Sequence, residues 1–404
     1  MQADKNTSIF LKSYDRSDWK NVRLGDIVEY SKGTGLSKEK LSDKGLYRCI
    51  LYGELFTRYK EIINTVHSKT FCLEGTPSVA GDVLLPGSTT TCGEDLAKAS
   101  SLNFEDILLG GDIIILRPKK NQVIGDFLSY LIPMYKKDML KYTQGITIIH
   151  LQGKKLLDLT ISIPPIDIQK NIVKNIQKID LLISNLEKLI SKQESIKKST
   201  KKMLLTPKPG WKKFLLGDIC DVSGAGVDKK IHPNEERVIL LNYLDVYHKT
   251  YVHKSGLDHV VSAKAKQKNR CSVRKNDIFF TPSSETPDDI AKSCVAMEDM
   301  QDVAYSYHII RARPKIPCNS LFVKYACSTH DFFAQAETAC VGSGKRYVIS
   351  LSKFREFSIF VPEIAEQNII AKSLYDMDMQ IEQLKQQLAK VQKVKQGMMS
   401  YFFG

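Results

Sequence analysis

The chain carries one pattern twice, and this repeat limits the possible fold more than any other feature of the sequence. Trp19 opens the stretch Trp-Lys-Asn-Val-Arg-Leu-Gly-Asp-Ile, and Trp211 opens Trp-Lys-Lys-Phe-Leu-Leu-Gly-Asp-Ile. They are the two tryptophans of the sequence, 192 positions apart. Solenoid repeats have periods of about 20–50 residues, so a period of this length predicts two tandem domains.

The match continues along the chain with an offset that grows slowly. Arg117-Pro118 corresponds to Arg313-Pro314 at an offset of 196, and Gln169 corresponds to Gln367 at an offset of 198. A duplication followed by small changes in loop length would leave such a drift. The chain is therefore interpreted as two related halves, each with its own connector.

Each half closes with a segment that has the spacing of a long helix. Apolar residues alternate three and four positions apart over about three heptads, the pattern of a coiled-coil seam rather than of a surface helix. Prolines precede both segments, and Pro207 ends the first because proline cannot continue a helix. The expected seam consists of Ile172, Ile176, Ile179, Ile183, Leu186 and Ile190 in the first segment and of Ile370, Leu374, Met377, Ile381, Leu384 and Leu388 in the second.

These segments are long enough to act as spacers. Roughly 35–40 residues of α-helix extend about 50–60 Å. A helix with an exposed seam is unstable alone, so we expect the two helices to form an antiparallel coiled coil with a globular unit at each end. In the alternative arrangement, each helix packs only on its own domain.

The globular parts combine strands and helices. Short apolar runs such as Ile113–Leu116, Val238–Leu241 and Ile278–Phe280 read as strands, and helical stretches follow near 124–139 and 320–337. The predicted fold class is mixed α/β, with two strand-rich domains and two long helices in an internal repeat. The expected boundaries are 1–163 and 207–361 for the domains, and 164–206 and 362–404 for the helices.

Charge and cysteine usage restrict the partners and the cellular setting. Lysine and arginine outnumber aspartate and glutamate by 59 to 45, and the formal net charge is +14. Such a balance favours a polyanion, with nucleic acid first and an anionic membrane surface second. The nine cysteines stand singly, which indicates reduced thiols and no structural zinc. No apolar run is long enough to span a bilayer, so no membrane insertion is expected.

Several loops carry the residue types that contact DNA. Hydroxyl, tyrosine, lysine and arginine side chains supply hydrogen bonds to phosphates and base edges, and hydroxyl-rich loops occur at matching places in both halves. Any single residue of these loops is better explained as part of a solvated surface; the whole set, in a chain of this charge, favours DNA contact. The candidates are Lys32, Thr34, Tyr52, Arg58, Tyr59, Lys60, Ser88, Thr89 and Thr90 in the first half and Tyr243, Tyr247, Lys249, Lys266, Lys268, Arg270, Ser283, Ser284, Thr286, Ser343, Lys345 and Arg346 in the second.

Motifs for catalysis are missing from the sequence. There is no Gly-x-x-x-x-Gly-Lys-Ser/Thr loop to cradle a nucleotide, and no Asn-Pro-Pro-Tyr-like stretch of the kind that amino-methyltransferases use. His248, His253 and His259 form a loose group whose spacing suits no particular metal site. The sequence therefore predicts no catalytic residue, no metal and no cofactor bound by this chain.

Several motifs occur in the same order in both halves of the chain. They are the Trp-x-x-x-x-Leu-Gly-Asp-Ile openings, the stretches Tyr52–Thr57 and Asn242–Tyr247, the helix entries Pro164–Ile172 and Pro362–Ile370, and the helix end Lys197–Leu205, echoed by Tyr401–Phe403. In their order and duplication these motifs resemble the DNA-specificity subunit of type I restriction–modification systems over essentially the full length. The first helix entry departs from the family pattern, because it has Ile168-Gln169 where Glu-Gln is usual.

This resemblance implies a role and a set of partners. Each globular unit would read one half of a bipartite, asymmetric sequence in double-stranded DNA, and the helices would set the gap between the halves. The helices would also dock methyltransferase subunits, expected to be two, and ATP-dependent restriction/translocase subunits. The subunit itself would not be an enzyme; S-adenosylmethionine, ATP and Mg are expected on the partners, in the prokaryotic cytoplasm.

Two other functions stay open at this point. The first is a stand-alone DNA-modifying enzyme, which would bind S-adenosylmethionine or cleave DNA with a metal. The second is a basic coiled-coil scaffold, which would bind DNA of any sequence and anionic lipid equally well.

Overall fold

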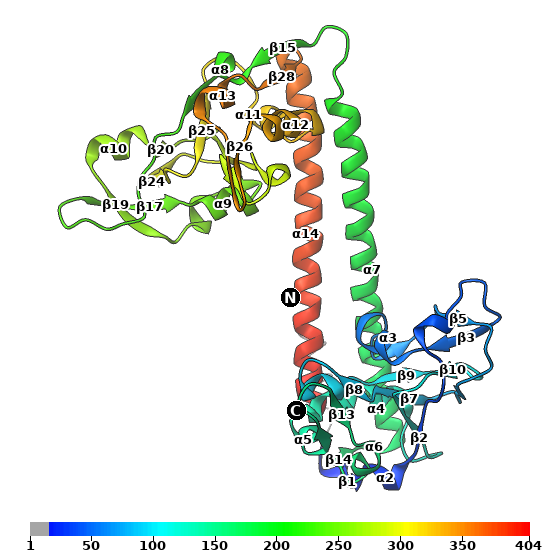
Figure 1. Ribbon diagram of the computed structural model, residues 1–404. Helices are drawn as coiled ribbons and strands as arrows, with labels where there is room; N and C mark the ends of the chain where they lie inside the picture. Colours follow the sequence, from blue (N-terminus) through cyan, green and yellow to red (C-terminus); the bar gives the residue numbers. More distant parts are fainter. Residues whose placement is uncertain (1–15) are drawn as a thin grey trace. The chain divides into compact units, whose positions relative to one another are not determined.

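The computed structural model describes residues 16–404, so the first 15 residues of the predicted domain 1–163 lie outside the described part. The chain divides into two compact units, which are described separately. Unit 1 comprises Met1–Glu187 and Gln387–Gly404, and unit 2 comprises Lys188–Gln386. Two helices of 40 residues each, α7 (Ile166–Leu205) and α14 (Ile364–Phe403), contribute to both units (Figure 1).

Unit 1 is built on a five-stranded sheet with the order β2-β11-β7-β9-β4, accompanied by sheets of four, three and two strands. The strands of these sheets are, in turn, β2 (Val28–Lys32), β11 (Ile113–Pro118), β7 (Asp82–Pro86), β9 (Ser100–Leu102) and β4 (Ile62–Ile63); β5 (Lys69–Thr70), β3 (Tyr47–Ile50), β10 (Leu108–Leu109) and β6 (Thr76–Pro77); β12 (Thr143–Gln144), β13 (Ile149–Leu151) and β8 (Ser88–Thr89); and β1 (Lys20–Arg23) and β14 (Thr160–Ile163). Its shorter helices are α2 (Leu24–Ile27), α3 (Tyr52–Thr57), α4 (Gly125–Leu131), α5 (Lys136–Met139) and α6 (Gly153–Leu156).

Unit 2 repeats this plan around a five-stranded sheet with the order β16-β25-β21-β23-β18. Sheets of four, three and two strands accompany it, as in unit 1. The main sheet consists of β16 (Cys220–Ser223), β25 (Ile310–Pro314), β21 (Ile278–Phe280), β23 (Ser293–Ala296) and β18 (Tyr251–Val252). The smaller sheets consist of β19 (Val260–Ala263), β17 (Glu236–Leu241), β24 (Met300–Tyr305) and β20 (Ser272–Val273); of β22 (Ser283–Ser284), β27 (Arg346–Val348) and β26 (Val341–Ser343); and of β15 (Lys212–Leu215) and β28 (Ser358–Val361). Its shorter helices are α8 (Leu216–Ile219), α9 (Tyr243–His248), α10 (Ala265–Arg270), α11 (Ser320–Ala326), α12 (His330–Ala339) and α13 (Leu351–Arg355).

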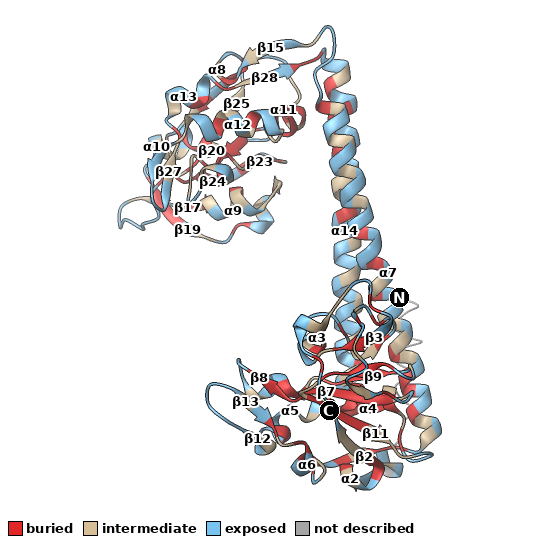
Figure 2. Ribbon diagram, turned by 45° about the vertical axis from the view of Figure 1, so that its right-hand side comes forward, coloured by how far each residue is buried: buried red, intermediate tan, exposed pale blue. Residues whose placement is uncertain are grey.

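The strands expected from apolar runs are confirmed. Ile113–Leu116 lies in β11, Val238–Leu241 lies in β17, and Ile278–Phe280 is β21. Both predicted helical stretches are interrupted, because 124–139 is split between α4 and α5 and 320–337 between α11 and α12. The central strands of unit 1 are buried (Figure 2), and the apolar face of its main sheet forms one core with α4.

Each unit incorporates the end of one long helix and the beginning of the other. In unit 1, Ile172 and Ile176 of α7 share a core with Met398 and Phe402 of α14. In unit 2, Leu205 of α7 shares a core with three α14 residues, Ile370, Ala371 and Leu374. The helices therefore pack both on the strand-rich domains and on each other, and the two packing alternatives raised by the sequence are combined.

A buried glutamine fixes the start of each long helix. Gln169 is fully buried; its Oε1 accepts from the N–H of Ile124 at 3.1 Å, and its Nε2 donates to the carbonyl of Pro164 at 2.9 Å. Gln367 makes the equivalent bonds in unit 2, to the N–H of Asn319 at 2.9 Å and to the carbonyl of Pro362 at 2.9 Å. A buried amide that satisfies two backbone groups specifies one geometry.

A carboxylate in unit 1 joins three elements. Asp180 of α7 accepts a hydrogen bond from the hydroxyl of Tyr130 in α4 at 2.6 Å, and Lys395 of α14 lies 2.7 Å from its other oxygen. Lys395 also lies over the Tyr130 ring. Burial, together with the bond to Asp180, raises the pKa of Tyr130, so this hydroxyl stays protonated and donates.

Unit 2 contains the same junction with the helices exchanged. Asp378 of α14 pairs with Lys197 of α7, and it accepts from the hydroxyls of Tyr325 and Tyr251, each at 2.8 Å. Burial raises the pKa of Asp378, but the bonds from Lys197 and the two tyrosines outweigh it and hold this pKa below its usual value. Asp180 and Asp378 are 198 positions apart, as are Lys197 and Lys395.

Further lysines surround this unit 2 junction. Burial lowers the pKa of Lys201 to about 8, and the charge of Lys197 adds to the effect. Lys201 donates to the carbonyl of Ser328 at 2.6 Å. Burial likewise lowers the pKa of Lys324, on α11, to about 8. The lysine-rich end of α7 is therefore partly structural, and Lys197 and Lys201 are not simply a solvated face.

The two tryptophans differ in how their indole N–H groups are satisfied. Trp211 donates to Glu366 at 3.2 Å, and Lys208 lies 2.9 Å from the same carboxylate. The equivalent position in unit 1 is Ile168, and the buried Nε1 of Trp19 has no partner among the described residues. The departure from the usual Glu-Gln entry thus leaves one polar group orphaned.

We predict that Glu366→Ile destabilises unit 2, because it reproduces this orphaned indole at Trp211. A buried donor without a partner costs about 1–3 kcal/mol. The reciprocal change, Ile168→Glu, should stabilise unit 1 by about 1 kcal/mol. Urea unfolding followed by the fluorescence of one tryptophan, with the other replaced by phenylalanine, measures each unit separately. Equal midpoints for parent and variant in both units would contradict this assignment.

Candidate nucleic-acid interface

In unit 1, a small sheet brings hydroxyl side chains beside a hairpin. Strand β8 pairs with β13, so that Ser88 lies opposite His150 and Thr89 opposite Ile149. The Ser88 hydroxyl bonds to Asp112, and the Thr89 hydroxyl lies 2.8 Å from that of Thr91. The predicted hydroxyl loop is therefore a structured edge rather than a free loop, and Ser88 and Thr89 are corrections, because they are only 6% and 8% exposed.

A groove of about 1280 Å³ lies beside this sheet and is lined by residues of unit 1 alone. Six carboxylates and four lysines line it, so its charge does not favour a DNA phosphate. Lys60, one of these lysines, pairs with Glu187 at 3.4 Å. The candidates that the groove brings together are Tyr52, Tyr59, Lys60, Ser88, Thr89 and Thr90.

Unit 2 has a groove of about 920 Å³ in the corresponding place, after α9 and beside the long helices. It has the opposite charge balance, because five lysines and three carboxylates line it. Lys249 belongs to this groove and also pairs with Asp245 at 2.6 Å. A net positive lining fits a phosphate, and the two grooves therefore differ in charge although their frameworks match.

The three-stranded sheet of unit 2, with the order β22-β27-β26, contains or adjoins most of the DNA-contact candidates of that unit. Strand β22 pairs with β27, so that Ser284 lies opposite Tyr347, and β27 pairs with β26. The Tyr243 hydroxyl donates to the carbonyl of Ser283 at 2.5 Å, and the Ser284 hydroxyl donates to the carbonyl of Thr286 at 2.5 Å. The hairpin between β26 and β27 carries Ser343, Lys345 and Arg346, all exposed.

Some candidate side chains are already engaged. Tyr59 is a correction, because it is 5% exposed within an apolar core and its hydroxyl faces the backbone N–H of His67. Arg58 pairs with Glu54 at 3.1 Å. The Tyr247 hydroxyl donates to Asp289 at 2.6 Å. These bonds position the loops and leave less of each side chain for a ligand.

Two further groups of candidates lie apart from the small sheets. Lys32 and Thr34 are exposed at the end of β2, where Thr76 bonds to the Lys32 carbonyl at 2.8 Å. Lys266 and Arg270 are exposed on α10. Lys268, on the same helix, bridges Glu236 at 3.0 Å and Asp302 at 2.6 Å, and so serves mainly to hold α10 in place.

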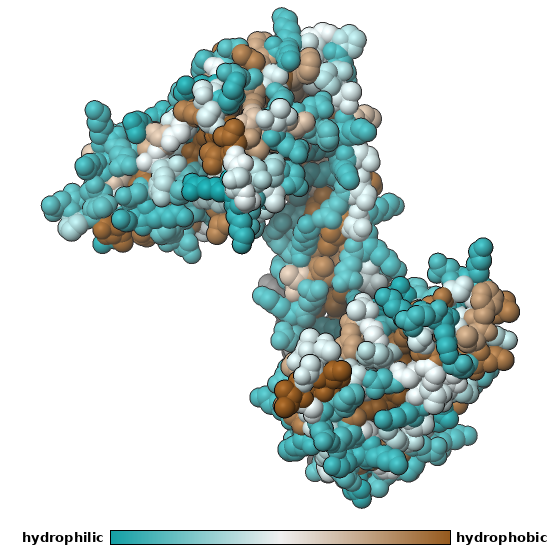
Figure 3. Space-filling view, viewed as in Figure 1, coloured by the Kyte–Doolittle hydropathy of each residue, from teal (hydrophilic) through white to brown (hydrophobic). Residues whose placement is uncertain are grey.

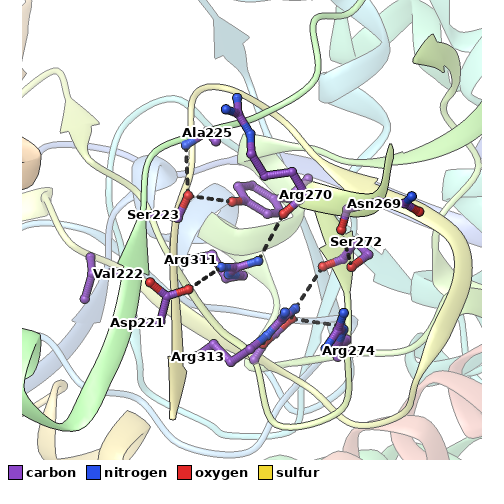
Figure 4. Close-up of polar contacts among 12 residues, drawn as sticks. Asp221, Val222, Ser223, Ala225, Asn269, Arg270, Ser272, Arg274, Arg311 and Arg313 are labelled. Atoms are coloured by element: carbon purple, nitrogen blue, oxygen red, sulfur yellow. Dashed lines mark hydrogen bonds and ion pairs between the residues drawn. The ribbon is translucent and has the colours of Figure 1, made fainter. Parts of the chain in front are cut away.

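A buried arginine supports α10 (Figure 4). Arg311 is 5% exposed; it donates to Asp221 at 2.8 Å and to the carbonyl of Arg270 at 3.2 Å, and it lies over the Tyr305 ring. The equivalent residue of unit 1 is Ile115. The buried Asp277–Arg313 pair, by contrast, is shared, since Asp82 and Arg117 make the same two bonds at 2.8 and 2.9 Å.

The sequence reasoning missed the hairpin of unit 1. Strands β12 and β13 are joined by a turn that carries Ile146 and Ile148, which are 97% and 50% exposed. A signal was present, because this hairpin has the same place in its unit as the hairpin that carries Ser343, Lys345 and Arg346: β13 pairs with β8 as β27 pairs with β22. Apolar residues at a loop tip carry none of the polar groups from which a nucleic-acid contact is predicted.

Neither metal nor membrane features accompany these surfaces. Within residues 16–404, no group of three or more His, Cys, Asp or Glu side chains is placed to hold a metal ion. Of the loose histidine group, His259 bonds to Asn242 and His253 lies 3.8 Å from Glu298. Over the same residues, no helix combines the length and apolar character needed to cross a membrane.

Comparison with known proteins gives the family. A model described as the type I restriction modification DNA specificity domain matches twice, over residues 16–197 and 208–393. A Methanocaldococcus jannaschii protein named for the specificity subunit of the type I restriction enzyme MjaX is 24% identical over 95% of this chain and 92% of that protein. The MjaVIII specificity subunit of the same organism is 28% identical over 47% of this chain and 42% of its own length.

The fold also has a counterpart among solved structures. The S subunit of a type I restriction-modification system from M. genitalium superposes with a TM-score of 0.63 at 14% identity, over 96% of each chain. At this identity the likeness concerns the fold. It confirms the predicted mixed α/β architecture of two tandem strand-rich domains with long helices.

Proposed function

This chain belongs to the family of type I restriction–modification DNA specificity subunits, and from this membership we propose that it reads a bipartite, asymmetric sequence in double-stranded DNA. Unit 1 reads one half-site and unit 2 the other. The observation that carries the proposal is a shared framework with different chemistry at equivalent loops. The hairpin tip of unit 1 carries isoleucine, whereas that of unit 2 carries lysine and arginine. This difference is expected if the two units bind different sequences.

The chain is not itself an enzyme, since a specificity subunit recognises DNA and does not catalyse. The chemistry belongs to its partners. We propose methyltransferase subunits, two in number, that bind S-adenosylmethionine, and restriction/translocase subunits that use ATP and Mg. Because the ligand is the cell's DNA, the proposed place of action is the prokaryotic cytoplasm.

The long helices supply the spacing in this proposal. Each has 40 residues, which corresponds to about 60 Å of α-helix. One turn of B-DNA is about 34–36 Å, so an antiparallel pair of this length suits a gap of several unread base pairs. The Asp180 and Asp378 junctions support this role, because each fixes one unit onto both helices.

Mapping of N6-methyladenine in DNA from cells with and without this chain tests the proposal. We expect a motif of two short, different half-sites around a fixed gap, present in cells that contain the chain and lost on its deletion. An unchanged methylation pattern, with active methyltransferase present, refutes it. Binding of the purified chain to anionic vesicles as strong as to DNA of any sequence would instead favour the scaffold alternative.

Lengthening the helices tests the spacer role. Duplicating Leu186–Lys192 in α7 together with Leu384–Lys390 in α14 preserves the seam, because both insertions are one heptad at matching positions. Seven residues add about 10 Å, so we expect a gap longer by about three base pairs and unchanged half-sites. A folded, active variant that keeps the original gap would contradict the spacer role. A variant with the duplication in only one of the two helices serves as a control, because it disrupts the pairing of α7 with α14.

A second stripe on α7 supports partner docking. Leu189, Ile196 and Met203 recur every seven residues and are 40%, 40% and 64% exposed. They lie outside the seam that faces α14. An apolar heptad stripe left in solvent is suited to another amphipathic helix, and we propose that a methyltransferase subunit covers it.

Charged substitutions test this docking surface. The triple variant Leu189→Glu, Ile196→Glu, Met203→Glu should lose co-purification with the methyltransferase subunit of its own system, since it places charges in an apolar contact. The matched control changes the preceding exposed residues Lys188, Ser195 and Lys202 to glutamate and should keep the complex. Helix content by circular dichroism should stay unchanged in both. Retention of the complex by the first variant would exclude this stripe as the docking surface.

A further inference from the structure

The β12–β13 hairpin of unit 1 presents an apolar side chain to solvent on a built turn. Ile146 is 97% exposed. Gly145 has a φ of +123°, and a Cβ there would lie 2.0 Å from the Ile148 carbonyl, so the turn requires glycine. A hydrophobic surface is visible in Figure 3 on the part of unit 1 where Figure 1 labels β8 and β13. Leaving such a side chain in water forgoes the free energy of burial.

The tip itself carries no cation for a phosphate, and its side chains fit a base edge. Residues 143–149 contain no charged side chain. The exposed polar side chains beside the tip are the Thr147 hydroxyl and the His150 imidazole. An apolar tip beside hydroxyl and imidazole groups suits the major groove, whose floor mixes hydrogen-bonding groups with the thymine 5-methyl.

The matching hairpin of unit 2 strengthens this assignment. There the turn carries Gly344, Lys345 and Arg346, and its strand β27 pairs with β22 as β13 pairs with β8 in unit 1. Cationic side chains bind phosphates or guanine. Two hairpins that occupy one place in a common framework, one apolar and one cationic, are expected to contact different groups of the DNA.

We propose that Ile146 is a specificity-determining residue that reads thymine through its 5-methyl group in the half-site of unit 1. A two-stranded β-ribbon fits the major groove, so a hairpin tip reaches the methyl without opening the duplex. The proposal rests on the DNA-reading function proposed above. Beyond that function, it specifies the base that is read, the groove in which it is read and the side chain that reads it.

Replacing thymine by uracil provides the test, because uracil pairs identically but lacks the methyl group. The complex of this chain with its methyltransferase subunits first selects its sequence from a randomised duplex library. Duplexes of that sequence then carry deoxyuridine at one thymine at a time. We expect one position in the unit 1 half-site where uracil weakens wild-type binding about fourfold, equivalent to about 0.8 kcal/mol. Ile146→Ala should bind both duplexes equally, near the wild-type affinity for uracil.

The controls separate this inference from the function on which it rests. Leu46→Ala removes another exposed apolar side chain of unit 1, 77% exposed, and should keep the wild-type uracil effect. A wild-type complex that selects no sequence refutes the DNA-reading function itself. Selection of a sequence with no uracil effect in the unit 1 half-site, or an Ile146→Ala variant that keeps the full uracil effect, overturns the role of Ile146 and leaves the DNA-reading function standing.

Discussion

Two partly buried carboxylates hold the architecture together, because each is bonded at once to both long helices and to a strand-rich domain. Asp180 is held by Tyr130 and Lys395, and Asp378 by Tyr325 and Lys197. Each ion pair joins a residue of one repeat to a residue of the other. Pairs with a nearly constant sum of residue numbers define antiparallel helices, whereas parallel helices would give a constant difference. Removing one partner would leave a charge uncompensated in a partly buried place.

The parts of the fold that sequence reasoning identified are those with long periodic signals. The heptad pattern predicted both helices, and the predicted seam residues are buried or half-buried. The carboxylate junctions were not predicted, because an aspartate or lysine on a helix reads as a solvated face whatever it contacts. Tyr59 failed as a candidate for a related reason: aromatic residues serve both cores and interfaces, and burial depends on tertiary packing. Ile146 was missed because exposure at a tip has no sequence signature of its own.

Core and surface diverged to different degrees after the duplication. The Asp82–Arg117 and Asp277–Arg313 pairs and both helix-entry glutamines kept their bonds. Such groups have little freedom, since a buried polar network tolerates no partial satisfaction. Hairpin tips and groove linings have no such restriction, and there the charge of the side chains has changed sign or disappeared.

One core position shows how a change inside the framework reaches a surface. Ile115 in unit 1 corresponds to Arg311 in unit 2, and a buried guanidinium requires partners that an isoleucine does not. Arg311 finds them in Asp221 and in the carbonyl of Arg270 at the end of α10. The exposed basic groups of α10 are thereby tied to the sheet. Rigid elements position a binding residue better than a free loop does, so the internal substitution and the basic surface are parts of one adaptation of unit 2.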